Sequence, residues 1–222
     1  MNHTQGFSIS GIKWKLAQTL ELRWWKSYLK GRSKQEYLAW KSAYWSDFLV
    51  SIGVPFPQGK RLMDAGCGPA GIFMVLHQDN QVTALDPLLE SYEAQVSVFS
   101  KADYPKVNFL AQSLESLDAT NQFDEIYCLN AINHVANFEL SLRNLHTALK
   151  PGGRLILSSD LHRWKLLKPI FRAIPGDALH PQQHDLEDYE NICTEVGFAR
   201  LGKVLVKREL IFDYWALVLE KI

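Results

Sequence analysis

The chain has 222 residues, of which 47% are hydrophobic and 22% are charged. This composition is typical of a globular protein with enough apolar side chains for a substantial core. The 24 basic residues balance the 24 acidic ones, so no net charge draws the protein to nucleic acid or to an anionic membrane. We therefore expect a small, roughly neutral ligand, with no nucleic-acid partner and no membrane partner.

The start, MNHTQGFSISGIKWK, lacks the continuous apolar segment of a secretory signal. No later run approaches the roughly 18 apolar residues that span a membrane, so a cytoplasmic protein is predicted. Cys67, Cys128 and Cys193 are odd in number and far apart, which fits neither a disulfide framework nor paired Cys-x-x-Cys zinc motifs. Three reduced thiols and no metal site are expected.

Residues 12–50 carry apolar side chains at spacings of three and four, interrupted around Gly31, which predicts two amphipathic helices. We treat residues 1–50 as a helical appendage to a main domain of residues 51–222. Packing onto that domain is the favoured role of its aromatic side chains, and a lid over the site is the alternative. These aromatic residues are Trp24, Trp25, Tyr28, Tyr37, Trp40, Tyr44 and Trp45.

From residue 60, short apolar runs alternate with helix-like segments. This alternation predicts βαβ units and an α/β fold, a doubly wound and mostly parallel sheet with helices on both faces. Helices are expected from about Gly71, over residues 88–101 and over residues 139–150. The predicted strand runs are RLMDAG, QVTALD, VNFLAQSL, FDEIYCLN and GRLILSSD.

The C-terminal part has a different pattern. Residues 185–198 predict a helix that ends at Gly197, and the two apolar runs after it have no helix between them. Those runs, within residues 199–221, should therefore pair as an antiparallel hairpin. Residues 160–184 form an insertion after the fifth strand, with three prolines and three histidines. Ligands are often bound at this edge of a parallel sheet.

The segment LMDAGCGPAGIF, residues 62–73, contains a Gly-x-Gly-x-x-Gly run. In dinucleotide enzymes such a loop holds a pyrophosphate, but Asp64 at ~4 Å from that anion would cost about 1 kcal/mol even in water. S-adenosylmethionine (SAM) carries a sulfonium and an ammonium instead, which a carboxylate attracts. Gly66 and Gly68 let the backbone approach the methionine and ribose parts. The combination favours SAM over a nicotinamide cofactor.

The motifs DAGCGPAG, ALDP, FDEIYCLNAINHV and LKPGGRLILS follow one another between residues 60 and 160. In this order the chain resembles the class I SAM-dependent methyltransferases of the small-molecule type. The resemblance implies a Rossmann-like seven-stranded sheet with an antiparallel C-terminal hairpin. It implies SAM as methyl donor and S-adenosylhomocysteine as product. It also implies that Asp64, Gly66 and Gly68 surround the methionine and ribose, that Asp86 accepts the ribose hydroxyls, and that Pro87 flanks the adenine.

Three further positions follow from the same resemblance. Ser113 and Leu114 stand where the family usually has an Asp beside the adenine amino group, which is a departure from the pattern. A neutral hydroxyl is the weaker partner, so backbone groups would carry more of the adenine recognition. Asn130 ends the fourth strand, where the family contacts the cofactor.

Methyl transfer from a sulfonium is an in-line displacement that needs no enzyme nucleophile, so positioning and a base suffice. His134, just after the fourth strand, is the candidate catalytic base, with helix capping or packing as the other interpretation. His180 and His184 have a metal-compatible spacing, but Pro181 favours an exposed loop pair. Asp160 could bind the acceptor or cap the insertion.

The predicted function is transfer of a methyl group from SAM to an O, N or C atom of a small-molecule acceptor, by a monomer or homodimer. One alternative is a nicotinamide-dependent oxidoreductase, which Asp64 and Pro69 disfavour. Another is a non-catalytic SAM-fold module that binds a partner through its Trp-rich helices. RNA modification is disfavoured because the chain lacks a dense basic patch.

Overall fold

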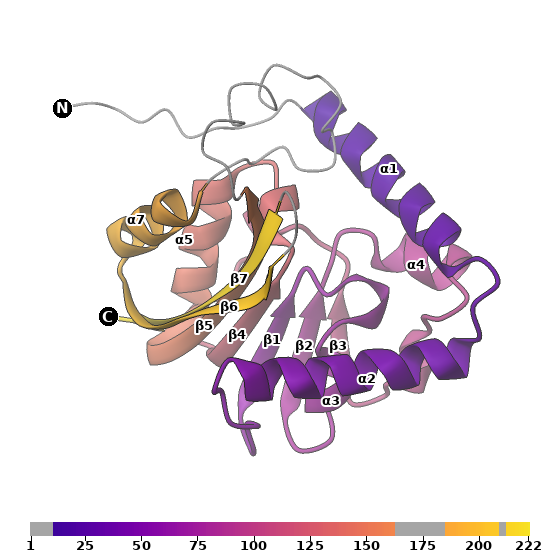
Figure 1. Cartoon of the computed structure of the whole chain (residues 1–222), viewed down its shortest axis with the longest axis horizontal. Coiled ribbons are helices and arrows are strands. Elements are labelled where there is room, and N and C mark those ends of the chain that lie inside the picture. Colours follow the sequence, from indigo (N-terminus) through magenta and orange to yellow (C-terminus); the bar gives the residue numbers. More distant parts are fainter. Residues whose placement is uncertain (1–10, 163–184, 209–211) are drawn as a thin grey trace.

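A seven-stranded sheet of order β3-β2-β1-β4-β5-β7-β6 forms the centre of the protein (Figure 1). The computed structural model describes residues 11–162, 185–208 and 212–222. The first five strands are parallel, and β7 pairs antiparallel with both β5 and β6. The predicted doubly wound sheet with a C-terminal hairpin is therefore confirmed. The strands are β1 (Arg61–Ala65), β2 (Gln81–Leu85), β3 (Val107–Leu110), β4 (Phe123–Leu129), β5 (Leu149–His162), β6 (Phe198–Arg208) and β7 (Phe212–Lys221).

Each predicted helix is present. The helices expected from about Gly71 and over residues 88–101 are short, with four and seven residues. Residues 88–101 are helical only to Gln95, because the backbone turns extended at Val96 (φ −118°, ψ 108°) and buries Val98 and Phe99 in the core. The α-helices are α1 (Gly11–Leu29), α2 (Lys34–Ser51), α3 (Phe73–Leu76), α4 (Leu89–Gln95), α5 (Phe138–Ala148) and α7 (Leu186–Val196). Short 3-10 helices span Gly68–Ala70, Lys101–Asp103, Leu114–Ser116 and Ile132–His134.

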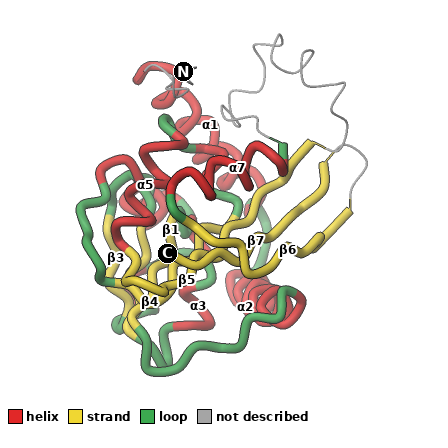
Figure 2. Tube along the Cα trace, turned by 90° about the vertical axis from the view of Figure 1, so that its left-hand side faces the viewer, coloured by secondary structure: helices red, strands yellow, loops and turns green. Residues whose placement is uncertain are grey.

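Helices cover both faces of the sheet, and Figure 2 shows α2 on one side with α5 and α7 on the other. Successive side chains of β4 point to opposite faces of the sheet. Tyr127 packs in the cluster of Phe48 and Phe73, whereas Ile126 packs in the cluster of Leu145 on the other face. The N-terminal helix α1 runs beside α4 (Figure 1), where Lys26 donates a hydrogen bond to Gln95 over 3.2 Å. The two helices before the sheet thus contact its helical layer, α1 through α4 and α2 through α3.

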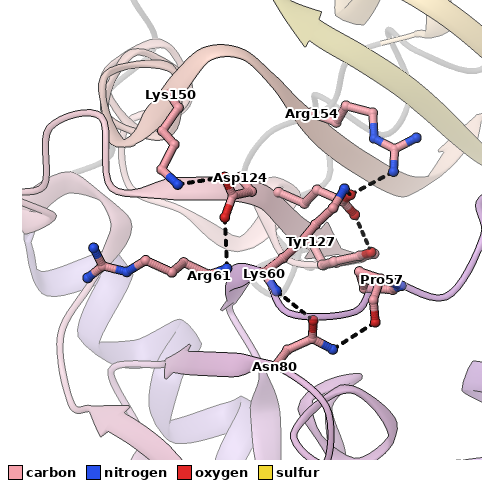
Figure 3. Close-up of polar contacts among 9 residues, drawn as sticks. Pro57, Lys60, Arg61, Asn80, Asp124, Tyr127, Lys150 and Arg154 are labelled. Carbon is pink, nitrogen blue, oxygen red and sulfur yellow. Dashed lines mark hydrogen bonds and ion pairs between the residues drawn. The ribbon is translucent and has the colours of Figure 1, made fainter.

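A network of ion pairs closes the amino-terminal edge of the sheet (Figure 3). Glu125 is fully buried and pairs with Lys60 and Arg154, while Tyr127 donates its hydroxyl to the same carboxylate over 2.7 Å. Burial alone would raise the pKa of Glu125, but these hydrogen bonds hold it below its ordinary value. Since a buried charge needs such partners, this edge has a structural role, and the carboxyl-terminal edge is the one left for a ligand.

The region of the predicted insertion begins as strand, because β5 continues to His162. The rest of the insertion lies outside the described residues, as do His180, His184 and the side chain of His162. The helix α7 begins at an Asp185 capping box and ends at Gly197, whose φ of 109° confirms the predicted stop. None of the described helices is long and apolar enough to cross a membrane.

The three cysteines are buried free thiols, as the spacing predicted. Burial raises the pKa of each one above its ordinary value. They are therefore structural and chemically quiet side chains.

Candidate functional site

The glycine loop after β1 is tied to the end of β2. The backbone N–H groups of Gly66 and Cys67 donate to the carbonyl of Leu85 over 2.7 and 3.0 Å, and Gly68 donates to Asp86 Oδ2 over 3.0 Å. Gly66 and Gly68 adopt φ values of 77° and 56°, a region that glycine enters without strain. The loop is thus held across the carboxyl ends of two adjacent strands.

Asp64 lies behind this loop. Its side chain is 2% exposed, and Oδ2 accepts the backbone N–H of Phe73 over 2.9 Å. A Cβ at Gly71 would stand 2.3 Å from the same oxygen, so the loop fits around the carboxylate. Burial raises the pKa of Asp64 to about 7, opposed by the Phe73 N–H and by the charge of Lys41.

Asp86 follows β2 and is 6% exposed. Its Oδ1 accepts the N–H of Leu88 over 2.8 Å and its Oδ2 accepts that of Gly68 over 3.0 Å. Burial and the nearby Glu21 carboxylate raise the pKa of Asp86 to about 7. Each carboxylate oxygen has a second lone pair, so Asp86 can still accept hydrogen bonds from a ligand.

Two adjoining cavities lie at this edge of the sheet, with volumes of about 500 Å³ and about 70 Å³. Gly66, Asn130, His134 and Glu21 of α1 line both of them. Most of the predicted site residues are brought together here, whereas Asp64 stands behind the loop. Gly68 lines the larger cavity, and Asp86, Pro87, Ser113 and Leu114 line the smaller one.

Asn130 and His134 form the boundary between the cavities. Asn130 has a φ of 52°, which is uncommon outside glycine, and its N–H donates to the Ser158 carbonyl over 2.9 Å. His134 ends the 3-10 helix after β4, and its N–H donates to the Ala131 carbonyl over 3.0 Å. The turn after β4 is thereby directed at the glycine loop.

Aromatic residues of α1 and α2 form one wall of the larger cavity. Tyr37 and Trp45 are buried, and Trp45 Nε1 donates to the Ala70 carbonyl of the main domain over 3.0 Å. Trp24 and Trp40 remain 48% and 50% exposed. We call the lining set the aromatic wall; it consists of Trp24, Trp25, Tyr28, Tyr37, Trp40, Tyr44 and Trp45.

Lys41 is a site residue that the sequence analysis missed. Its Nζ lies 4.3 Å from the ring centroid of Trp45, 4.8 Å from Tyr44 and 5.7 Å from Trp40. Within the described part of the chain it makes no hydrogen bond and no ion pair. Burial lowers the pKa of Lys41 to about 8, with Asp64 opposing the shift. An ammonium so placed at a cavity attracts an anionic group.

A polar group adjoins the aromatic wall at Tyr44. Asp160 of β5 is the register partner of Tyr214 of β7, which is in turn the partner of Lys207 of β6. The Tyr214 hydroxyl is 2.7 Å from Ser158 Oγ. Burial raises the pKa of Tyr44 on α2, and Tyr214, Asp160 and Lys207 also act on it. We call Tyr44, Asp160, Lys207 and Tyr214 the hairpin cluster; all four line the larger cavity.

The described residues contain no group of three or more His, Cys, Asp or Glu side chains that could hold a metal ion. The polar groups of the cavities instead match an organic ligand with hydroxyl, cationic and anionic parts. The carboxylate of Asp86 lines the smaller cavity, the ammonium of Lys41 lines the larger one, and the carboxylate of Glu21 lines both.

Comparison with known families and curated proteins agrees with this geometry. The family model "Methyltransferase domain" matches residues 37–201, well over half of the chain. Two ubiquinone biosynthesis O-methyltransferases, from Rickettsia akari and Rickettsia felis, are 34% and 35% identical over 99 residues. Each alignment covers 44% of this chain and 39% or 40% of the relative. The chain therefore spans about two fifths of the length of these curated relatives.

Solved structures share the fold at low sequence identity. The Burkholderia thailandensis 1,6-didemethyltoxoflavin-N1-methyltransferase, solved with 1,6-didemethyltoxoflavin and S-adenosylhomocysteine, has a TM-score of 0.62 at 16% identity, over 96% of this chain and 91% of that one. The [4+2]-cyclase SpnF has a TM-score of 0.63 at 17% identity, over 81% of this chain and 80% of that one. At these identities the likeness establishes the architecture.

Proposed function

Because this chain belongs to the methyltransferase domain family, we propose that it transfers a methyl group from SAM to a small-molecule acceptor and releases S-adenosylhomocysteine. The observation that carries the proposal is the position of Lys41. An ammonium without an ion pair in the described chain shares a cavity with the glycine loop, and the carboxylate of Asp86 lines the adjoining one. A ligand with a carboxylate at one end and ribose hydroxyls at the other matches both.

The smaller cavity is assigned to the adenosine. The free lone pairs of Asp86 would accept the ribose hydroxyls, with Glu21 beside them on α1. Pro87 and Leu114 supply apolar surface for the adenine, and the Ser113 hydroxyl stands at the same cavity. Because Leu114 and Ser113 replace the family's usual Asp, backbone groups would carry more of the adenine recognition.

The larger cavity is assigned to the methionine part and the acceptor. Lys41 would pair with the methionine carboxylate, and Gly66 and Gly68 would approach the chain of the ligand. Asp64 would act from behind, by holding the loop through Phe73 and by balancing the charge of Lys41. In this arrangement Asp64 supports the loop around the methionine and ribose parts from the side away from the cavity.

SAM supplies an already activated methyl group, so the chain's task is to bind, to orient and to exclude water. The helices α1 and α2 are proposed to form a lid, since Glu21 of α1 lines both cavities and the aromatic wall lines the larger one. His134, on the boundary of the cavities, stays a candidate for the base that removes the acceptor proton. A cytoplasmic monomer or homodimer is the proposed working form.

The names of the curated relatives favour oxygen as the methylated atom. The second candidate function is a non-catalytic SAM-fold module that binds a partner through the Trp-rich helices, and the half-exposed Trp24 and Trp40 favour it. The nicotinamide alternative is weaker, because the carboxylate of Glu21 lines both cavities together with Gly66 of the loop that would hold a pyrophosphate.

Calorimetric titration of the full chain with SAM, S-adenosylhomocysteine and NADH tests the proposal. Micromolar binding of the first two without binding of NADH is the expected result. Binding of NADH alone would indicate hydride transfer, and no binding of any ligand would favour a module that recognises a partner.

A further inference from the structure

The two walls of the larger cavity differ in chemistry, and this difference identifies the class of acceptor. Building on the proposed function, we propose that the acceptor is a planar aromatic ring with a hydroxyl group, that the hydroxyl oxygen is methylated, and that Asp160 receives its proton. The ring would lie against the aromatic wall. The hydroxyl would face the hairpin cluster.

The aromatic wall offers flat apolar surface to a ligand. Trp24 and Trp40 are 48% and 50% exposed although both line the cavity. The rings of Trp24 and Tyr28 are already stacked, with centroids 4.9 Å apart and planes at 6°. Indole faces that are half exposed beside a cavity are best covered by another planar ring, in stacked or edge contact.

Three members of the hairpin cluster form one row across three strands, and the fourth, Tyr44, belongs to α2. Asp160, Tyr214 and Lys207 are register partners on β5, β7 and β6, and neighbouring strands are about 4.8 Å apart. Of these three strand residues, Asp160 is the nearest to the cofactor end, because β5 adjoins β4, whose last residue is followed by Asn130. A hydroxyl at Asp160 would therefore be close to the donor, and the rest of the ring would extend along the row.

The charges around the cavity favour a hydroxyl over other acceptor groups. Glu21 and Asp160 are acidic, whereas Lys41 and Lys207 are basic, and the donor adds a positive sulfonium. An ammonium acceptor would be repelled by the cations and attracted by the carboxylates, and a carboxylate acceptor would meet the reverse, so the mixed charges select neither. A neutral hydroxyl avoids both, and the hydroxyls of Tyr44 and Tyr214 can orient it.

The methyl transfer needs only the acceptor hydroxyl, the sulfonium donor and the Asp160 carboxylate. The acceptor oxygen forms the new bond to the methyl carbon while the carbon–sulfur bond breaks, and sulfur keeps that electron pair as a neutral thioether. The hydroxyl proton passes to the Asp160 carboxylate and then to solvent. A positioned base of this kind contributes about 100- to 10,000-fold to the rate.

Three probes with one ring system test the acceptor class: 2-naphthol, 2-naphthylmethylamine and 2-naphthoate. Binding of S-adenosylhomocysteine is measured first by calorimetry, and each probe is then titrated into that complex. Methyl transfer from radiolabelled SAM is followed for all three probes. 2-Naphthol is expected to bind about tenfold or more tightly than the other two and to be the one that is methylated.

Two matched variants test the role of Asp160. Asp160→Asn is expected to lower kcat on 2-naphthol about 100-fold, to remove the acidic limb of the pH profile and to leave binding of S-adenosylhomocysteine unchanged. Asp47→Asn, an exposed carboxylate on α2, should change none of these. His134→Gln tests the other candidate base and should retain the acidic limb.

The outcomes separate the two proposals. If the wild-type chain does not bind S-adenosylhomocysteine, the proposed function itself is overturned. Binding of S-adenosylhomocysteine without binding of 2-naphthol, or a preference for the amine or the carboxylate, would overturn the acceptor class alone. An acidic limb that disappears in His134→Gln and persists in Asp160→Asn would mean that His134, and not Asp160, receives the proton of the acceptor.

Discussion

Lys41 and Trp45 lie one helical turn apart on α2, and the ammonium of Lys41 is 4.3 Å from the ring centroid of Trp45. A cation above an indole face is stabilised by the ring, but only in part when it is removed from water. The ammonium of Lys41 can therefore still attract an anionic ligand in the cavity. This relationship connects the fold of the N-terminal helices to the proposed cofactor site.

Replacing Lys41 with Met is the direct test of that connection. A charge-assisted hydrogen bond contributes about 1.5–3 kcal/mol, so Lys41→Met should weaken SAM binding by about 10- to 100-fold. Calorimetry measures the loss, and the exposed Lys30→Met serves as the matched control. Unchanged affinity in Lys41→Met would place the methionine carboxylate elsewhere.

The affinity for SAM should also depend on pH through the same residue. Burial lowers the pKa of Lys41 to about 8, so the ammonium loses its proton as the pH rises above that value. The Kd for SAM should then increase by up to about tenfold per pH unit. In Lys41→Arg the guanidinium stays charged, and the curve should retain only the titration of the ligand. Parallel curves for the two proteins would argue against Lys41.

The parts of the site that could be predicted from sequence are those set by one local rule. Gly66, Asp86 and Asn130 each follow a parallel strand, and such strands end at the same edge of the sheet. The sequence alone therefore predicts that these three residues lie close together. The shared lining of the two cavities agrees with that rule.

Lys41 and Glu21 could not be found in this way, because they belong to helices whose docking depends on tertiary packing. Both helices carry side chains of every kind on several faces, so periodicity alone does not identify the face at the cavity. The one local signal was the spacing of Lys41 from Trp40, Tyr44 and Trp45. Likewise, α4 ends early because Val98 and Phe99 are buried in the core, and such tertiary packing overrides the helix propensity of the sequence.

Gly71 is predicted to tolerate no side chain. A Cβ there would lie 2.3 Å from Asp64 Oδ2 and 2.5 Å from the Cys67 carbonyl oxygen. Overpacking of this kind costs about 1–3 kcal/mol, and about 2–4 °C of Tm per kcal/mol is expected for a chain of this size. Gly71→Ala should therefore lower Tm and SAM affinity together.

Gly202→Ala is the matched control for that change. Its added Cβ would stand 3.7 Å from Val218, an ordinary contact in β6. Thermal unfolding should show no loss of Tm for this variant. Equal losses in the two alanine variants would mean that the fit around Asp64 is not what requires glycine.

The stability of the ligand-free protein should fall as the pH rises, because Asp64 is buried. Its folded-state pKa is about 7, above the roughly 3.9 of an unfolded Asp, so the folded state binds the proton more tightly. The contribution is fully present below the unfolded value and is lost as the pH rises through about 7. The Tm of the wild type should therefore be lower at pH 8 than at pH 5.

Asp64→Asn isolates that contribution, since the amide cannot ionise and its oxygen can still accept the Phe73 N–H. Its Tm should fall less between pH 5 and pH 8 than that of the wild type, although Asp86, with its pKa also raised to about 7, keeps part of the decline. The exposed Asp47→Asn should follow the wild type. An unreduced decline in Asp64→Asn would mean that Lys41 keeps Asp64 ionised in the folded protein, and the two residues would then form a charge pair behind the loop.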